Sequence, residues 1–202
     1  MYVAVGASET VGIGADDPAG EAWPQVLHDS ALSTSTLVNV GVSGATVRHA
    51  LNTQLPQAVA AEPDVVTVWL AVNDLIGLAP VRDYETQLQR LVAALREGGE
   101  AQVLVGNVPD LWRLPAYRAC LPGSDVAELA CLLPSVPSVA DVRAIVEEFN
   151  AAIERVVDAE GAELVDLSGR GELTGLTAAD GFHPSTAGHQ EIAEAFERAL
   201  AL

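Results

Sequence analysis

A serine near the start of the chain and a histidine near its end are the residues best suited to chemistry. Ser8 follows the short apolar run Tyr2–Val5 and a glycine. Because glycine lets the backbone turn sharply, the Ser8 hydroxyl is expected to project beyond the end of a strand. Two residues separate Asp180 from His183. In a turn, Asp180 can accept a hydrogen bond from Nδ1 of His183 and leave Nε2 free to take a proton. These residue types suit nucleophilic attack assisted by a general base.

Two further positions could supply hydrogen-bond donors to a reacting oxygen. Gly44 follows the second apolar run and has no side chain to block the approach of a ligand to the backbone N–H. Asn73 follows the third run, and its amide could donate to a negatively charged oxygen as it develops. Taken singly, each of these residue types is also common in turns and at helix starts, where it has no catalytic role.

The other histidines are predicted to be structural. His28 and His49 fall in helical patterns without a carboxylate partner like Asp180, and His189 is expected on the surface of the last helix. One histidine and one aspartate make a poor metal site without a third ligand. We therefore predict neither a metal ion nor a cofactor.

The elements that must position these residues alternate along the chain. Short apolar or β-branched runs predict five strands, at Tyr2–Val5, Thr36–Val40, Val65–Val72, Gln102–Val105 and Glu163–Leu167. Helical spacing of apolar residues predicts helices around Leu88–Leu95 and Val142–Val156, a weaker one from Gly20 to about His28, and a last helix capped by Ser185. Alternating strands and helices predict a parallel sheet covered on both faces, with ligands at the carboxyl ends of the strands.

Ser138 and Asp141 have the spacing of a capping box for the second of these helices. The preceding segment, 110–137, does not fit the alternation, because it is too long for an ordinary connection. We expect it to be a lid-like insertion in a single domain spanning 1–202. Cys120 and Cys131 within it could form a disulfide or remain free thiols. Its large apolar side chains predict an acyl pocket; they are Leu111, Trp112, Leu114, Leu121, Leu132 and Leu133.

The charge of the chain excludes several classes of function. Among 202 residues, 28 Asp and Glu stand against 10 basic residues, all of them Arg, which gives a formal net charge of −18. Such a chain repels nucleic acids and anionic lipid surfaces. The longest apolar run is too short to cross a bilayer. No basic segment followed by an apolar one opens the chain, so no signal peptide is predicted and a cytoplasmic location is favoured.

In chain order, the motifs resemble those of the GDSL/SGNH hydrolase family, named for its Ser, Gly, Asn and His. Ser8 within Gly6-Ala7-Ser8-Glu9-Thr10 matches the nucleophile motif, and Gly44 and Asn73 match the second and third motifs. Asp180 and His183 match the Asp-x-x-His motif near the carboxyl end. The resemblance implies a flavodoxin-like three-layer α/β/α sandwich with a five-stranded parallel sheet, and it implies hydrolysis of small-molecule esters.

The resemblance also implies roles for these residues. Ser8 would attack the ester carbonyl, His183 would take its proton and pass it to the leaving alcohol, and Asp180 would orient the imidazole. The N–H groups of Ser8 and Gly44 and the side chain of Asn73 would form the oxyanion hole. Acyl esters and O-acetylated sugars are both expected substrates, and water is favoured over another alcohol as the final acceptor.

Three positions depart from the family pattern. Ala7 stands where the family usually has Asp, and it is small enough to keep the turn. Ala71 stands where Gly often precedes the third motif, which can alter how Asn73 is held. Glu9 replaces an apolar residue and adds negative charge that should disfavour anionic substrates.

Two alternative functions are open at this stage. An esterase of the α/β-hydrolase type would use Ser43, but the stretch Gly41–Ala45 fails the last position of the G-x-S-x-G elbow. A non-catalytic module could bind carbohydrate or lipid through aromatic side chains, for which the candidates are Trp23, Trp112 and Tyr117. Packing in the core or the lid is the favoured use of these three side chains.

Overall fold

The computed structural model describes residues 1–97, 101–124, 126, 131, 136–169 and 175–200. Within these ranges five strands form one sheet, in the order β2-β1-β3-β4-β5. Every pairing in it is parallel. The strands are β1 (Tyr2–Gly6), β2 (Leu37–Asn39), β3 (Val65–Trp69), β4 (Gln102–Gly106) and β5 (Glu163–Val165). The predicted five-stranded parallel sheet is confirmed.

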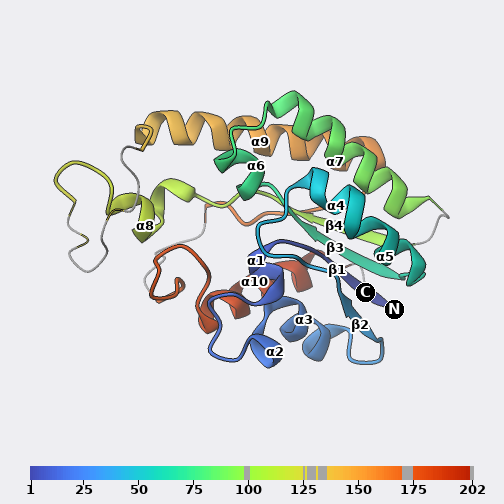
Figure 1. Cartoon of the computed structure of the whole chain (residues 1–202). Helices are drawn as coiled ribbons and strands as arrows, with labels where there is room; N and C mark the ends of the chain where they lie inside the picture. The colour runs from blue at the N-terminus through green and yellow to red at the C-terminus, as the bar shows by residue number, and fades with distance from the viewer. Residues whose placement is uncertain (98–100, 125, 127–130, 132–135, 170–174, 201–202) are drawn as a thin grey trace.

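Helices cover both faces of this sheet (Figure 1). One face carries α4 (Val47–Thr53), α5 (Leu55–Ala60), α7 (Val81–Arg96) and α9 (Val139–Glu160), and the other carries α2 (Pro18–Glu21), α3 (Trp23–Ala31) and α10 (Thr186–Ala199). The shorter elements are α1 (Ser8–Val11), α6 (Val72–Ile76), the 3₁₀ turn η1 (Leu111–Arg113) and α8 (Pro115–Arg118). The chain therefore has the three-layer α/β/α architecture that the sequence predicts.

A separate apolar core lies on each face. Under α7 and α9, Tyr84 packs against Phe149 with ring centroids 4.7 Å apart. On the other face Trp23 stacks on Phe196 at 4.4 Å and is completely buried. Trp23 was weighed for contact with a sugar or acyl group, with packing in the core as the favoured use. Its ring fills the core between α3 and α10, which confirms core packing.

Two helix starts agree with their predicted caps. The Ser138–Asp141 capping box is formed at the start of α9, and the Ser185 side chain accepts a hydrogen bond from the N–H of Gly188. The predicted helix from Gly20 to His28 is divided, because Ala22 has an extended backbone between α2 and α3. Pro24 lies in the first turn of α3, where its missing N–H costs no hydrogen bond.

The third strand is shorter than expected, because the run Val65–Val72 contains a strand and the start of a helix. Strand β3 ends at Trp69, and Val72 already belongs to α6. The side chain of Asp74 on α6 accepts a hydrogen bond from the N–H of Val47, which fixes this turn against the start of α4. The hydrogen bond between Asp74 and Val47 joins the helical turn α6 to α4, and the spacing of apolar residues does not reveal this contact.

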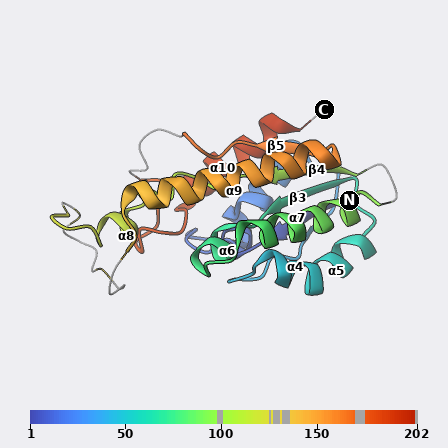
Figure 2. The ribbon, with the colours of Figure 1, turned by 90° about the horizontal axis from the view of Figure 1, so that it is seen from above.

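The segment 110–137 contains η1, α8 and a disulfide between Cys120 and Cys131, whose Cα atoms are 4.7 Å apart. The bond settles the choice between a disulfide and two thiols. The N–H of Ala116 in α8 donates to the carbonyl oxygen of Gly181, beside the predicted catalytic histidine. Both views place α8 beyond the end of the sheet that lies away from the amino terminus (Figures 1 and 2). Leu132 and Leu133, predicted to line a pocket, lie outside the described residues.

Over the described ranges, no helix combines the length and the apolar character that crossing a membrane requires.

Candidate functional site

Ser8 is the first residue of α1, directly beyond the carboxyl end of β1. Its residue is 6% exposed, so the hydroxyl sits at the floor of the site rather than on the outer surface. The strand end beneath it is held by Gln54, whose Nε2 donates to the carbonyl oxygen of Gly6 and whose Oε1 accepts from the Gly6 N–H. Gln54 is fully buried and was not singled out from the sequence, because no local pattern links it to residue 6.

Asp180 and His183 form the hydrogen-bonded pair that their spacing predicts. Nδ1 of His183 lies 2.5 Å from Oδ2 of Asp180, and Oδ1 accepts the N–H groups of Phe182 and His183 at 2.9 and 3.0 Å. Burial raises the pKa of Asp180, but these hydrogen bonds outweigh it, and the pKa of this carboxyl lies below its ordinary value. Asp180 is therefore ionised at neutral pH. Within the described chain, Nε2 of His183 has no hydrogen-bond partner.

The segment that follows α1 carries Ser8 toward the histidine turn. The N–H of Asp16 donates to Oγ1 of Thr186 at the start of α10. Gly14 has a φ of +100°, and a Cβ built on it would meet the carbonyl oxygen of Pro184 at 2.1 Å and Cβ of His183 at 3.0 Å. A glycine is required here because the segment lies directly against the histidine turn.

His189 bonds to the segment that follows α1. The prediction that it lies on the surface is wrong. It is fully buried, with Nδ1 accepting from the N–H of Trp23 and Nε2 donating to the carbonyl oxygen of Ile13, each at 3.3 Å. Burial lowers the pKa of His189, which keeps the ring neutral and suits one nitrogen to accept while the other donates. Its partners are more than 160 positions away in sequence, so helical periodicity could not place it.

The Ser8 hydroxyl donates to Oε2 of Glu9, at 3.3 Å. Among the described residues, no hydrogen bond joins Ser8 to His183. Catalytic hydrogen bonds are commonly long or absent before a substrate binds. Glu9 was expected only to add negative charge, and its direct contact with the hydroxyl is a feature that the sequence does not specify.

Gly44 and Asn73 lie on neighbouring loops at the same edge of the sheet. Nδ2 of Asn73 donates to the carbonyl oxygen of Ala45 at 3.0 Å, which uses one of its two hydrogens and fixes the direction of the other. Gly44 has a φ of +76°, and its N–H makes no hydrogen bond to any residue that the structure describes. Both groups are thus available as donors, although Gly44 is exposed.

Asp74 joins these two loops, since its Oδ2 accepts the N–H of Val47 at 3.0 Å. The side chain is 5% exposed, and burial raises the pKa of Asp74 despite this bond. Its position next to Asn73 was visible in the sequence, but its partner two elements away was not. Asp74 therefore holds the Asn73 turn in place and does not itself face the site.

A pocket of about 100 Å³ opens beside this site. Glu9 stands at one wall, next to Ser8, and Phe182 and Pro184 flank His183 at another. Of the residues predicted to form an acyl pocket, Leu111 and Leu114 line it. Trp112 is not among its walls and lies 4.8 Å beneath the guanidinium of Arg143. The hydroxyl of Tyr117 donates to the backbone of Pro137.

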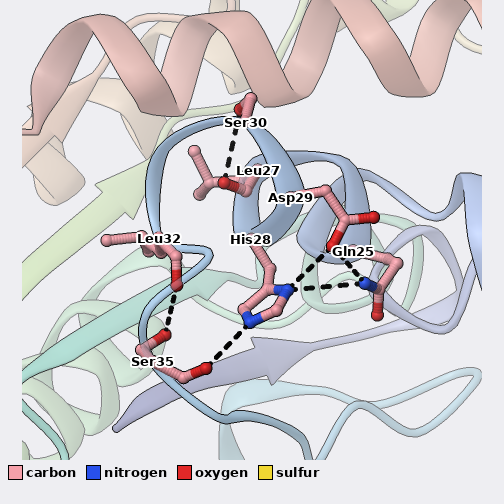
Figure 3. Close-up of polar contacts among 7 residues, drawn as sticks. All are labelled: Gln25, Leu27, His28, Asp29, Ser30, Leu32 and Ser35. Carbon is pink, nitrogen blue, oxygen red and sulfur yellow. Dashed lines mark hydrogen bonds and ion pairs between the residues drawn. The ribbon is translucent and has the colours of Figure 1, made fainter.

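His28 forms a second histidine–aspartate pair, which the sequence was expected to lack. Its Nδ1 lies 2.9 Å from Oδ1 of Asp29, and its Nε2 lies 3.1 Å from the carbonyl oxygen of Ser35 (Figure 3). The Ser35 carbonyl first, and then Asp29, raise the pKa of His28. Because both ring nitrogens are occupied, this pair joins α3 to the following loop, and the predicted structural position agrees with these contacts.

Ser43, the alternative nucleophile, is exposed in the turn after β2, and His49 is exposed on α4. Neither is joined to the other or to a carboxylate by a hydrogen bond among the described residues. Over the same residues, no three His, Cys, Asp or Glu side chains gather in a way that could hold a metal ion.

Comparison with known proteins identifies the family and the fold. The profile of the GDSL-like Lipase/Acylhydrolase family matches residues 4–191, which include every candidate site residue. The crystal structure of TesA is similar at 23% identity and a TM-score of 0.74, over 99% of this chain and 97% of TesA. The lipase/acylhydrolase from Enterococcus faecalis is 17% identical with a TM-score of 0.72, over 98% of this chain and 93% of that one.

The psychrotrophic esterase EstA from Pseudoalteromonas sp. is also 17% identical, with a TM-score of 0.68, over 98% of this chain and 94% of that one. At these identities the structural likeness establishes the fold. A search of curated proteins found no match to the chain. The family match extends from β1 to α10, and the motifs follow one another in the order of the family, so the chain belongs to the GDSL-like lipase/acylhydrolase family.

Proposed function

We propose that this acylhydrolase cleaves carboxylic esters through an acyl-enzyme on Ser8, with His183 as general base and Asp180 as the group that orients it. One observation carries the proposal. His183 is held by an ionised carboxylate at Nδ1, its Nε2 is unoccupied among the described residues, and its turn packs against the segment that leaves Ser8. A base with one anchored and one free nitrogen is what proton transfer from a hydroxyl requires.

In the first step the Ser8 hydroxyl leaves Glu9 and donates to Nε2 of His183. The Oγ–carbon bond forms as the proton passes to His183, and the carbonyl oxygen becomes an oxyanion. The oxyanion collapses, the bond to the alcohol breaks, and His183 returns the proton to the leaving oxygen. Water then repeats the sequence on the acyl-enzyme and releases the acid.

Three donors are proposed to hold the oxyanion: the N–H groups of Ser8 and Gly44 and the second hydrogen of Asn73 Nδ2. The bond from Asn73 to Ala45 supports this role because it sets the amide plane before substrate arrives. Donors fixed in advance stabilise developing charge without reorganising during the reaction. Ionised Asp180 stabilises the imidazolium that forms on His183.

The proposed substrates are esters that place a group with an apolar surface in the pocket, because most of the residues that line it are apolar. Leu111 and Leu114 come from segment 110–137, which supports the proposal that this insertion acts as a lid over the group bound in the pocket.

Turnover of p-nitrophenyl acetate and butyrate by the wild-type chain and by Ser8→Ala tests the proposal. We expect Ser8→Ala to lose at least about a thousandfold in kcat, whereas Ser43→Ala retains activity. The Pseudoalteromonas esterase is described as inhibited by monoethylphosphonate. We therefore also expect a fluorophosphonate to label Ser8, as mapped by mass spectrometry.

Label on Ser43 would support the alternative nucleophile. Failure to turn over any short ester, with carbohydrate or lipid binding retained, would support a non-catalytic module.

A further inference from the structure

Glu9 contacts the proposed nucleophile and also lines the apolar pocket. Its Oε2 is 3.3 Å from Oγ of Ser8, and the side chain lines the pocket together with apolar residues such as Leu167 and Ile192. A substrate group that occupies this pocket while its ester reaches Ser8 must therefore lie close to a carboxylate.

The ionisable residues around the pocket all carry the same sign. Besides Glu9 they are Asp110 and Glu191, and no arginine belongs to the lining in the part of the chain that the structure describes. Arg113 Nη1 lies 3.6 Å from Asp110 and offsets its charge. The described bond of Glu9 is instead to a neutral hydroxyl, so no neighbouring cation offsets its charge among the described residues.

The walls suit an organic cation. Trp69 and Phe182 contribute aromatic rings, and most other lining residues are aliphatic. A trialkylammonium group presents methyl groups that pack on such walls and a charge that carboxylates and aromatic rings attract. A substrate carboxylate in the same place would lose its hydration and meet a like charge. The net charge of −18 acts in the same direction at longer range.

We propose that Glu9 is a specificity-determining residue, which makes the site prefer esters with an ammonium group over uncharged esters of the same shape and over esters with a carboxylate. The inference rests on the proposed ester hydrolysis at Ser8. It concerns a position at which this chain carries a charge where the related motif usually has an apolar side chain.

The test compares esters that differ in charge and not in shape. On the alcohol side, acetylcholine is compared with 3,3-dimethylbutyl acetate. On the acyl side, methyl 4-(trimethylammonio)butanoate is compared with methyl 5,5-dimethylhexanoate. Each ratio of kcat/KM, cationic over neutral, is measured by pH-stat at low salt for the wild type, Glu9→Gln, Glu9→Leu and Glu163→Gln. Glu163 is exposed at the start of β5, so its variant changes net charge equally but away from the site.

We expect the wild type to favour the cationic ester of at least one pair by about tenfold. Both Glu9 variants should bring this ratio close to one, and Glu163→Gln should preserve it. Because each ratio compares two esters on one enzyme, a general loss of reactivity at Ser8 does not change it. A wild-type ratio near one in both pairs, or equal loss in Glu163→Gln, would overturn the inference.

A binding measurement separates this inference from the proposed function. Choline and 3,3-dimethyl-1-butanol are titrated by calorimetry into the wild type and Glu9→Gln. If no ester is turned over, the proposed function fails, and tighter binding of choline that depends on Glu9 still supports the inference. Equal binding of the two alcohols to the wild type counts against it.

Discussion

Asn73 illustrates how one side chain can be both anchored and available. One hydrogen of its amide is committed to the carbonyl oxygen of Ala45, and the neighbouring Asp74 binds the N–H of Val47. These two bonds fix the turn after β3 against the loop that bears Gly44. The proposed oxyanion donors therefore depend on a polar link between two loops as well as on their own identity.

Asn73→Ala should retain the fold and lose roughly 100-fold or more in kcat, because one donor to the oxyanion is removed. Loss of the bond to Ala45 should cost only about 1 kcal/mol of stability. Steady-state kinetics together with thermal unfolding check this expectation. Asn52→Ala, an exposed change on α4, is the matched control. Full activity in Asn73→Ala would remove this side chain from the oxyanion hole.

His28 gives a prediction for stability as a function of pH. Its pKa in the folded chain is raised above the ordinary 6.5 by the Ser35 carbonyl and Asp29. The protonated ring therefore adds stability that is complete below the unfolded pKa and is lost as the pH rises through the folded one. We expect His28→Gln to destabilise the chain more at about pH 5.5 than at about pH 9, by less than about 1 kcal/mol.

Urea denaturation at the two pH values measures this difference. His49→Gln, an exposed change on α4, is measured in parallel as the control. Equal destabilisation of His28→Gln at both pH values would argue against a charged ring in the folded state.

At the residue scale, the sequence specified what local spacing can encode. Asp180 and His183 are three positions apart and bond as predicted, because a single turn brings them together. The bonds of His189 and of Gln54 could not be predicted, since each partner is supplied by a distant element. The contact of Gly14 with the histidine turn joins residues far apart in the sequence, so no local pattern could predict it.

At the scale of elements, the segment after α1 links the helix that begins at Ser8 to the turn that bears His183. Gly14→Ala would place a Cβ 2.1 Å from the carbonyl oxygen of Pro184, at a φ of +100°. We expect this variant to lose at least about tenfold in kcat/KM, because a misplacement of about 1 Å is enough to do so. Its melting temperature should also fall, since backbone atoms must move.

Gly161→Ala is the matched control for Gly14→Ala. Gly161, which caps the end of α9, also has a positive φ, of +63°, but the nearest atom to a Cβ there would be Nη2 of Arg96, 3.8 Å away. This variant should cost about 1 kcal/mol in backbone strain and leave kcat/KM unchanged. If both variants behave alike, strain alone explains the effect and the contact with the histidine turn does not matter.

Element boundaries show where sequence patterns stop being informative. The five strands follow from apolar runs, and β1, with every residue buried, is the clearest of them. The run Val65–Val72 was assigned to one strand, because apolar residues continue unbroken from β3 into α6. The boundary is set by polar bonds of the residues that follow, and these require knowledge of the neighbouring loop.

For the whole molecule, the excess of acidic residues sets the response to salt. With 28 acidic and 10 basic residues, the folded chain concentrates like charge on its surface. Raising NaCl from about 20 mM to about 0.5 M should increase the melting temperature, because the shorter Debye length weakens this repulsion. Differential scanning calorimetry measures the change. KCl should give the same increase as NaCl, and a melting temperature that falls or stays constant would contradict the expectation.

The disulfide between Cys120 and Cys131 closes a small covalent ring. If one peptide bond within this ring is cut, the disulfide still joins the two parts of the chain. A single proteolytic nick inside the ring therefore leaves one molecule made of two peptides, with Ser8 on the first and His183 on the second. Such a nicked molecule should migrate on a denaturing gel as two bands only after thiol treatment.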